Sequence, residues 1–211
     1  IIGLTAVLVG KLLRKPVVLK ADSQGEMSGE FFDSGLRRFG ASRSSLPFRL
    51  FVGFRNAILK KANAFSAIST EIASEWSASK IPPNKIHLIP NGVDTALFAP
   101  VNAEQKTILR GKLRLPQAAS IAIYTGRLVS YKGLPLLLDV WDEVRCSHEN
   151  AILLLAGTGG LDIDNCEAQL HDYVKSAGLK ENVWFLGSVQ NIPEYLQAAD
   201  LFVFPDRKSV V

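Results

Sequence analysis

The feature that most constrains the fold is an alternation of short apolar runs with segments of helical periodicity, which occurs twice along the chain. Short apolar runs without polar alternation are typical of parallel strands that are buried on both faces. The runs lie at residues 16–20, 64–68 and 86–89 in the first half and at 121–124, 151–156, 183–186 and 201–204 in the second. Strands that alternate with helices predict right-handed βαβ units and a parallel sheet in each half.

The segments between these runs carry helix signals or are polar. Apolar spacing or a capping residue predicts helices at about 46–63, 70–79, 103–113, 134–148, 163–177 and 193–198. Ser69 is the expected N-cap of the second of these helices. Residues 21–44 are polar and rich in Gly and Ser, so we expect a long loop there.

The chain opens with an apolar run of ten residues that ends at Lys11. A helix that crosses a bilayer needs about 20 apolar residues, and this run also lacks the charged start and the cleavage site of a signal peptide. We interpret the run as a core helix whose beginning is missing. The alternative is a truncated membrane anchor.

A turn at Pro90–Asp94 and a connector that runs to Pro100 separate the two halves. The sequence therefore predicts two α/β domains, at residues 1–100 and 101–205, both of them incomplete. A chain of 211 residues with 47% hydrophobic and 21% charged residues can bury two such cores. The same composition excludes disordered and collagen-like proteins.

The net charge of +4 is unevenly distributed. Residues 1–100 contain 13 Lys and Arg against 7 Asp and Glu, whereas residues 101–211 contain 11 against 13. The basic first half is compatible with peripheral contact with anionic lipid or with an anionic substrate, and solvated surface charge explains it equally well. No basic run is interleaved with aromatic residues, so we expect no nucleic-acid partner. Cys146 and Cys166 have no metal or redox spacing and are expected to be free thiols.

The best candidate for a ligand site is the loop after the first strand of the second half, because open parallel sheets bind ligands beyond the carboxyl ends of their strands. In this loop Gly126 lets the backbone approach a ligand, Arg127 offers a planar fork of donors, and Lys132 adds a compact charge. Gly133 lies where the next helix is expected to begin, and a helix N-terminus favours anions. Two cations there suit a diphosphate. The alternative is a solvated loop with two surface charges.

The loops after the next two strands carry weaker signals. Residues 157–160 read Gly-Thr-Gly-Gly, half of a dinucleotide fingerprint whose third glycine position is occupied by Asp162. Gly187, Ser188 and Val189 follow the next strand, where their backbone groups are placed to contact the edge of a nucleotide base. The three histidines have no zinc spacing, so no metal site is expected.

In their order and spacing, these motifs resemble glycosyltransferase family 4, a large group of retaining enzymes with the GT-B fold. The segment Ile89–Asp94, with Phe98 and Pro100, looks like the interdomain connector of that family. The nucleotide-sugar domain of the family is similar to five stretches of this chain, which are 126–127, 132–133, 157–159, 185–189 and 195–205. Residues 1–80 resemble the later part of the acceptor domain more weakly.

The resemblance implies two Rossmann-like domains of GT-B type and retaining transfer of a hexosyl group from a nucleoside-diphosphate sugar to a glycan or lipid-linked acceptor. It implies that Arg127 and Lys132 are catalytic, because they would stabilise the charge of the leaving diphosphate. The implied substrate-binding residues are Gly126, Gly133, Gly187, Ser188 and Val189. The two cations would replace a metal ion, so no cofactor is expected. The implied location is the cytoplasm, with contact at the inner face of the membrane.

Two other functions stay open. A sugar-nucleotide epimerase of the GT-B fold would share the diphosphate site but would also need a pair of acid/base residues, which the sequence does not show. A non-catalytic nucleotide-binding or interaction module would need no such pair.

The resemblance also implies that the chain is truncated at both ends. The family continues after the position of Pro205 with two glutamates that hold the donor, whereas residues 206–211 read Asp-Arg-Lys-Ser-Val-Val. A common sequencing adapter encodes those six residues, so we interpret them as adapter-derived. A fragment that lacks half of its active site is expected to show no transferase turnover.

Overall fold

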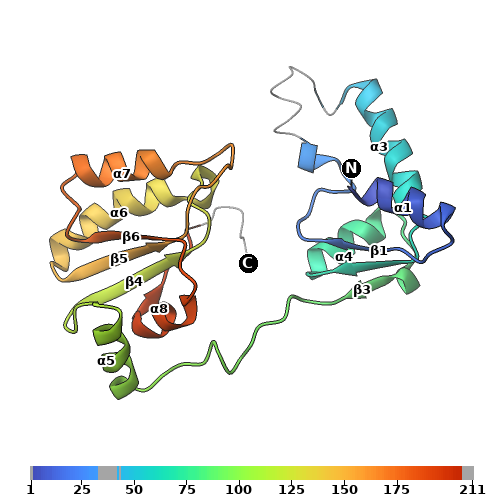
Figure 1. Ribbon diagram of the computed structural model, residues 1–211. Coiled ribbons are helices and arrows are strands. Elements are labelled where there is room, and N and C mark those ends of the chain that lie inside the picture. The colour runs from blue at the N-terminus through green and yellow to red at the C-terminus, as the bar shows by residue number, and fades with distance from the viewer. Residues whose placement is uncertain (1, 33–41, 43, 206–211) are drawn as a thin grey trace. The chain divides into compact units, whose positions relative to one another are not determined.

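The computed structural model describes residues 2–32, 42 and 44–205 (Figure 1). The chain divides after Gly92 into two compact units, and each is described here by itself. The adapter interpretation of residues 206–211 concerns a segment outside the described residues.

The first unit is built on a parallel sheet with the strand order β1-β2-β3. Its strands are β1 (Val18–Ala21), β2 (Ala64–Ala67) and β3 (Ile86–Leu88), its helices are α1 (Ile2–Leu12), α3 (Leu46–Leu59) and α4 (Thr70–Ala78), and 3₁₀ turns lie at Glu30–Phe32 and Pro83–Lys85. The core is centred where Phe65 of β2 meets Trp76 of α4 edge to face, with ring centroids 5.2 Å apart. The apolar run at the start of the chain is helical, and Val7 is buried in this core.

The loop after β1 is anchored by two charged side chains of the helices. The Glu75 carboxylate accepts hydrogen bonds of 2.8–3.1 Å from the backbone amides of Gly25, Met27 and Ser28. The buried guanidinium of Arg55 donates to the Glu26 carbonyl at 2.7 Å. Burial raises the pKa of the Glu26 carboxyl above its ordinary value, although the charge of Arg55 opposes the shift. The first part of the expected long loop therefore has a defined conformation.

The second unit is built on a parallel sheet with the strand order β6-β5-β4-β7. Its strands are β4 (Ser120–Thr125), β5 (Ala151–Ala156), β6 (Val183–Gly187) and β7 (Leu201–Phe202). Its helices are α5 (Ala103–Lys112), α6 (Leu134–Ser147), α7 (Glu167–Ser176) and α8 (Ile192–Ala198), with a 3₁₀ turn at Ser130–Lys132. In Figure 1, α6 and α7 cover one face of this sheet and α5 and α8 cover the other.

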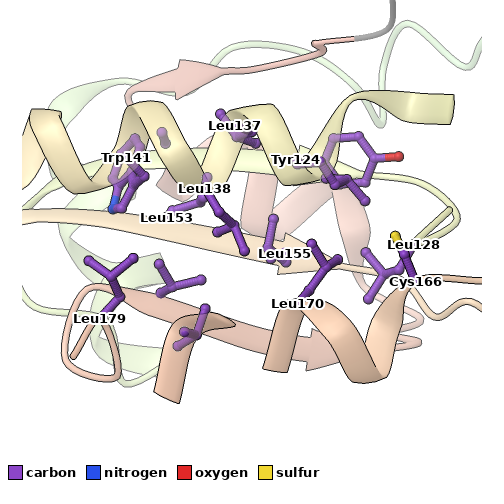
Figure 2. Close-up of a cluster of buried hydrophobic side chains, with 14 of the residues drawn as sticks. Tyr124, Leu128, Leu137, Leu138, Trp141, Leu153, Leu155, Cys166, Leu170 and Leu179 are labelled. Carbon is purple, nitrogen blue, oxygen red and sulfur yellow. The ribbon is translucent and has the colours of Figure 1, made fainter. Parts of the chain in front are cut away.

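Helices on both faces explain why the strands of this unit are continuously apolar. Every residue of β5 is buried. Leu153 and Leu155 belong to the cluster with Leu138 and Trp141 of α6 (Figure 2), whereas Ile152 and Leu154 belong to the cluster on the other face. Successive side chains of a strand point to opposite faces, so a strand covered on both sides needs no polar positions.

The strand order creates a switch point beside β4. The chain runs from β4 outward through β5 to β6 and then returns to the other side of β4 as β7. In open parallel sheets such a point is where ligands bind, beyond the carboxyl ends of the two strands. The loops after β4 and β7 are therefore the expected borders of a ligand site.

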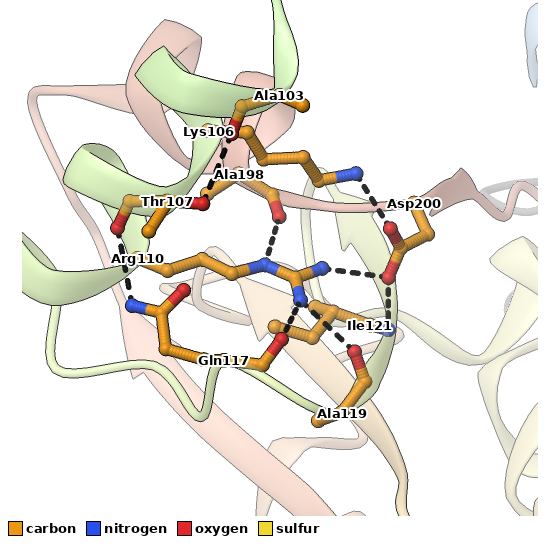
Figure 3. A network of polar contacts seen from close by, with 9 residues as sticks. All are labelled: Ala103, Lys106, Thr107, Arg110, Gln117, Ala119, Ile121, Ala198 and Asp200. Carbon is orange, nitrogen blue, oxygen red and sulfur yellow. Dashed lines mark hydrogen bonds and ion pairs between the residues drawn. The ribbon is translucent and has the colours of Figure 1, made fainter.

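A buried arginine fastens β7 and α5 to β4 (Figure 3). Arg110 of α5 donates to the carbonyls of Ala198, Gln117 and Ala119 at 2.8–3.1 Å and to the Asp200 carboxylate at 2.7 Å. Asp200 also accepts from the Ile121 amide at 2.7 Å. Burial alone would raise the pKa of Asp200, but the Ile121 amide, Lys106 and Arg110 outweigh it, and the pKa lies below its ordinary value.

The predicted elements are present, with differences at some boundaries. Ser69 is the N-cap of α4 and accepts from the Ile72 amide. The helix predicted at 163–177 begins only at Glu167, because the side chain of Asn165 bonds to the Gly160 carbonyl and the Glu167 amide and so holds the preceding residues in a turn. The strand predicted at 201–204 is assigned only at Leu201–Phe202.

The connector is tied to the second unit. Gln197 of α8 donates to the carbonyls of Leu97 and Ala99 at 3.3 and 3.0 Å. The second compact unit therefore begins at Val93, whereas the sequence analysis assigned residues 93–100 to the first domain as a connector.

Candidate functional site

At the carboxyl edge of the second sheet, the loops that follow β4 and β5 are bonded to each other along their backbones. Leu128 donates to the Thr158 carbonyl at 3.1 Å, and Cys166 donates to the Leu128 carbonyl at 3.1 Å. Ser130 donates to the Asp164 carbonyl at 2.9 Å. Backbone bonds between two loops restrict both of them, so side chains that project from this pair of loops start from fixed positions.

Glycines at the ends of β4 and β5 make the close approach of these loops possible. The φ angles are 148° at Gly126 and 139° at Gly157, values that other residues rarely adopt. A Cβ at Gly157 would lie 1.9 Å from the Gly126 carbonyl oxygen, and a Cβ at Gly126 would lie 2.8 Å from the Tyr124 hydroxyl oxygen. Neither position can accept a larger residue without movement of its neighbours.

Arg127 projects from this frame with its side chain 62% exposed, yet it has two partners. Its guanidinium forms an ion pair with the Asp162 carboxylate, which comes from the loop after β5. It also donates to the Tyr131 hydroxyl oxygen at 2.8 Å. The sequence analysis identified Asp162 only as a departure from a glycine motif, and the structure shows that it is the carboxylate partner of the candidate catalytic arginine.

Lys132 lies close to the same tyrosine. Its ammonium nitrogen is 5.8 Å from the centroid of the Tyr131 ring, and the Arg127 guanidinium carbon is 6.0 Å from that centroid. Lys132 also lies 5.0 Å from the Phe204 ring, which follows β7. Phe204 in turn stacks on Tyr124, with ring planes 10° apart. The structure therefore brings Arg127 and Lys132 together around one aromatic ring at the carboxyl end of β4, with Phe204 of the chain after β7 beside Lys132.

Gly133 connects this loop to α6. It is the N-cap of that helix, its φ angle is 75°, and a Cβ there would lie 2.3 Å from the Pro205 carbonyl oxygen. The first intrahelical bond runs from the Leu137 amide to the Gly133 carbonyl at 3.0 Å. The amides of the first turn therefore have no acceptor within the helix, and Pro135 has no N–H to offer. An anion at this terminus would meet the positive end of the helix dipole beside Lys132.

Gly187, Ser188 and Val189 lie at the carboxyl end of β6, on the same edge of the sheet. Gly187 adopts a φ angle of 65°, and its carbonyl accepts from the Gly157 amide at 2.8 Å. The β5/β6 register shifts at this point, between Leu155 and Ala156. The end of β6 is thus bonded to the end of β5. The predicted base-binding segment therefore lies two strands away from β4, whose following loop carries Arg127 and Lys132.

The arrangement is suited to an anionic group that is larger than one phosphate. A guanidinium binds two oxygens at once and an ammonium binds as a point charge, and here both cations are presented at one strand end next to a helix N-terminus. Two phosphates of a diphosphate can therefore be held by separate groups.

The sequence analysis missed the aromatic and acidic residues that position the cations. Tyr131 and Phe204 contact Lys132, and Asp162 pairs with Arg127. Loops after adjacent parallel strands are neighbours, so an acid in the loop after β5 and an arginine in the loop after β4 were a usable signal of this pair.

The described residues show three further features. Cys146 and Cys166 are free, with Cys166 buried at the start of α7. Across residues 2–32, 42 and 44–205, no three His, Cys, Asp or Glu side chains gather in a group that could hold a metal ion. In the same ranges, every helix is too short or too polar to cross a membrane.

Comparison with known proteins connects this geometry to a family. The sequence pattern described as "Glycosyl transferases group 1" matches residues 105–208, and the pattern described as "Glycosyltransferase Family 4" matches residues 2–97. Mannosylfructose-phosphate synthase from Agrobacterium fabrum is 36% identical over 128 residues, which are 58% of this chain and 28% of the relative. A GDP-mannose-dependent monoacylated alpha-(1-6)-phosphatidylinositol monomannoside mannosyltransferase from Corynebacterium glutamicum is 31% identical over 121 residues, 56% of this chain and 30% of the relative.

The fold has solved counterparts. The structure of Anabaena Alr3699/HepE in complex with UDP and glucose matches 96% of this chain and 49% of its own length, with a TM-score of 0.72 and 20% identity. The structure of WaaG, a glycosyltransferase involved in lipopolysaccharide biosynthesis, matches 91% of this chain and 51% of its own length, with a TM-score of 0.66 and 16% identity.

The chain thus spans about half the length of these solved structures and under a third of the two curated relatives. The two sequence patterns nevertheless account for both units in order, and the fold agrees with GT-B glycosyltransferases. On this evidence the chain belongs to glycosyltransferase family 4.

Proposed function

We propose that the protein transfers a hexosyl group from a nucleoside-diphosphate sugar to an acceptor, and that its second unit binds the donor. The observation that carries the proposal is the placement of Arg127 and Lys132 around Tyr131, at the strand end beside the N-terminus of α6. Homologues named as GDP-mannose- and UDP-galactose-dependent transferases support a nucleotide-sugar donor.

In this proposal the two cations act on the leaving group. As the glycosidic bond breaks, negative charge grows on the diphosphate, and fixed cations stabilise that charge more than the charge of the intact donor. Gly126 and Gly133 let the backbone approach the phosphates, and the segment Gly187–Val189 contacts the base. We propose that these cations do the work of a metal ion, so that transfer does not depend on a divalent cation.

The remaining features of the reaction belong to the same proposal. Transfer proceeds with retention of anomeric configuration, as the family resemblance implies, and the acceptor is a glycan or a lipid-linked glycan. Relatives named for lipopolysaccharide and diphosphoundecaprenol substrates support such an acceptor. The cytoplasm, where nucleotide sugars are available, is the proposed location, and the basic first half is the proposed region of peripheral contact with the membrane.

Calorimetric titration of the 211-residue chain with UDP and with GDP tests donor binding. Arg127→Ala and Lys132→Ala are each expected to lower the affinity for the nucleotide by about tenfold or more, because each removes a charge-assisted contact to phosphate. Lys175→Ala, an exposed lysine in α7, is the matched control and should leave the affinity unchanged. Equal affinities for the wild type and both site variants would remove the diphosphate assignment.

A further inference from the structure

A second cationic feature lies in the first unit, at the amino-terminal edge of its sheet. A hollow of about 390 Å³ opens there between the end of α1 and the residues that precede β1 and β2. Four of the side chains that line it are basic, and they are Lys11, Arg14, Lys15 and Lys61. None of the residues that line it is acidic.

The floor of the hollow is well defined. Val17 and Asn63, which precede β1 and β2, are joined by two hydrogen bonds of 2.9 Å, one from the Val17 amide to the Asn63 side-chain oxygen and one from the Asn63 amide to the Val17 carbonyl. Gly10 of α1 packs so closely that a Cβ there would lie 2.2 Å from a methyl carbon of Val17. The Lys15 amide donates to the Gly10 carbonyl at 2.8 Å and closes the turn after α1. The cations are therefore attached to a fixed backbone.

The wall of the hollow holds no acidic partner for its four basic side chains. Within the part of the chain that the structure describes, none of the four side chains forms an ion pair. Like charges around one hollow repel one another, and an anion that enters it relieves that repulsion. The hollow also lies at the opposite end of the strands from the carboxyl edge, where parallel sheets bind their substrates, so substrate binding at the carboxyl edge leaves these cations unexplained.

We propose that this hollow is a binding site for a phosphate group, either free in solution or carried by a lipid headgroup. Several ammonium and guanidinium groups around one small hollow match the charge and the multiple acceptor oxygens of a phosphate. Leu12 and Leu13 adjoin the cations and are 81% and 61% exposed, which is the pairing of apolar and basic side chains that anionic membrane surfaces attract. The residues that form this site belong to the first unit, whereas those of the proposed donor site belong to the second.

The first arm of the test uses inorganic phosphate and residue-resolved amide NMR of the 211-residue chain. Phosphate is expected to shift the signals of Lys15, Val17 and Asn63. In the double variant Lys15→Gln with Lys61→Gln, those shifts should need phosphate concentrations at least about tenfold higher. The control Lys80→Gln with Lys180→Gln removes the same net charge at exposed lysines outside the hollow and should titrate like the wild type.

The second arm uses vesicles of phosphatidylcholine with and without phosphatidylglycerol. The source is a lipid headgroup if the wild-type chain and the control variant sediment only with the anionic vesicles and the Lys15→Gln, Lys61→Gln variant does not. A response to inorganic phosphate without vesicle binding would identify a free phosphate. The proposal is overturned if neither probe perturbs the hollow, or if the hollow and control variants lose binding equally. Signals near Gly133 report the donor site in the same spectra, so failure of one site is distinguishable from failure of the other.

Discussion

The guanidinium of Arg127 is paired with the carboxylate of Asp162 across two loops that are themselves bonded along their backbones. Asp162 is more deeply buried than its partner, with 16% of its side chain exposed, and it also accepts from the Asp164 amide at 3.1 Å. A carboxylate therefore occupies a position where a phosphate oxygen of the proposed donor would bind. In the proposed donor complex, the phosphate would have to displace or share this contact.

Replacement of Asp162 by Asn is expected to strengthen the binding of UDP or GDP. The substitution removes a negative charge that competes with the nucleotide for Arg127. Because a partly exposed ion pair contributes little free energy, we expect the nucleotide affinity to rise by only about two- to fivefold. Calorimetry on the variant provides the measurement. Asp164→Asn, in the same loop but without an ion pair in the described structure, is the control. A weaker affinity in Asp162→Asn would mean that the pair organises the site rather than competing for it.

Gly133→Ala is expected to damage both the fold and the site. Gly178 also has a positive φ angle, 68°, but a Cβ there meets nothing within 4 Å, whereas a Cβ at Gly133 would meet the Pro205 carbonyl at 2.3 Å. Gly178→Ala should cost about 1–2 kcal/mol of stability from the backbone conformation alone. Gly133→Ala should cost about 1–3 kcal/mol more, because the clash adds to the same backbone term. Hydrogen exchange of the β4 amides would measure the loss of stability, and calorimetry would measure the loss of nucleotide affinity. Equal losses of stability in Gly133→Ala and Gly178→Ala would contradict the predicted clash.

Arg110→Met is expected to destabilise the second unit. The substitution removes the Arg110 donor from three carbonyls and leaves the Asp200 carboxylate with only Lys106 and the Ile121 amide among its described partners, and we expect a loss of about 2–4 kcal/mol in the free energy of unfolding. Faster hydrogen exchange in β4 and at Val203 would show the loss. Arg145→Met, which removes a pair with Asp142 on the surface of α6, should change these rates little. If both variants exchanged like the wild type, the network would not hold β7.

The acid stability of the second unit should depend on Asp200. Its pKa in the folded protein lies below the ordinary value of 3.8, so its stabilising contribution is present above that value and is lost as the pH falls through the lower, folded pKa. Asp200→Asn should therefore be less stable than the wild type at neutral pH, and the difference should shrink on acidification below about pH 4. Urea unfolding of both chains across this pH range is the measurement. A difference that grows on acidification would contradict the assigned direction of the shift.

Glu75→Ala is expected to loosen the loop after β1. It removes the acceptor of three backbone amides, at Gly25, Met27 and Ser28. Each amide left without an acceptor in this partly buried loop lowers the stability of the folded loop by up to about 3 kcal/mol. The exchange rates of these amides should rise, while those of β2 should change less. Glu71→Ala, one turn earlier on the same helix, is the control, because the described bonds of its carboxylate are with Ser69, Thr70 and the Glu71 backbone and none reaches the loop after β1.

Much of the fold was predictable because its determinants are local or periodic. The continuous apolar run of Ala151–Ala156 identified a strand covered on both faces, and Ser69 identified a helix start, since a capping hydroxyl acts within three residues. The start of α7 was wrong by four residues. Asn165 and the loop carbonyl that it binds decide that boundary, and periodicity carries no information about such a side-chain bond.

The sequence by itself determined the class of fold, the order of the strands along the chain, and the loop in which Arg127 and Lys132 lie. It could do so because apolar periodicity and the carboxyl-edge rule depend on residue type and spacing. Only the tertiary structure decided that β7 returns beside β4, that Phe204 of the chain after β7 lies beside Lys132, and that Asp162 pairs with Arg127. These relationships join residues of different βα units, and they depend on how the sheet is ordered and how closely glycines let two loops approach, which no local pattern encodes.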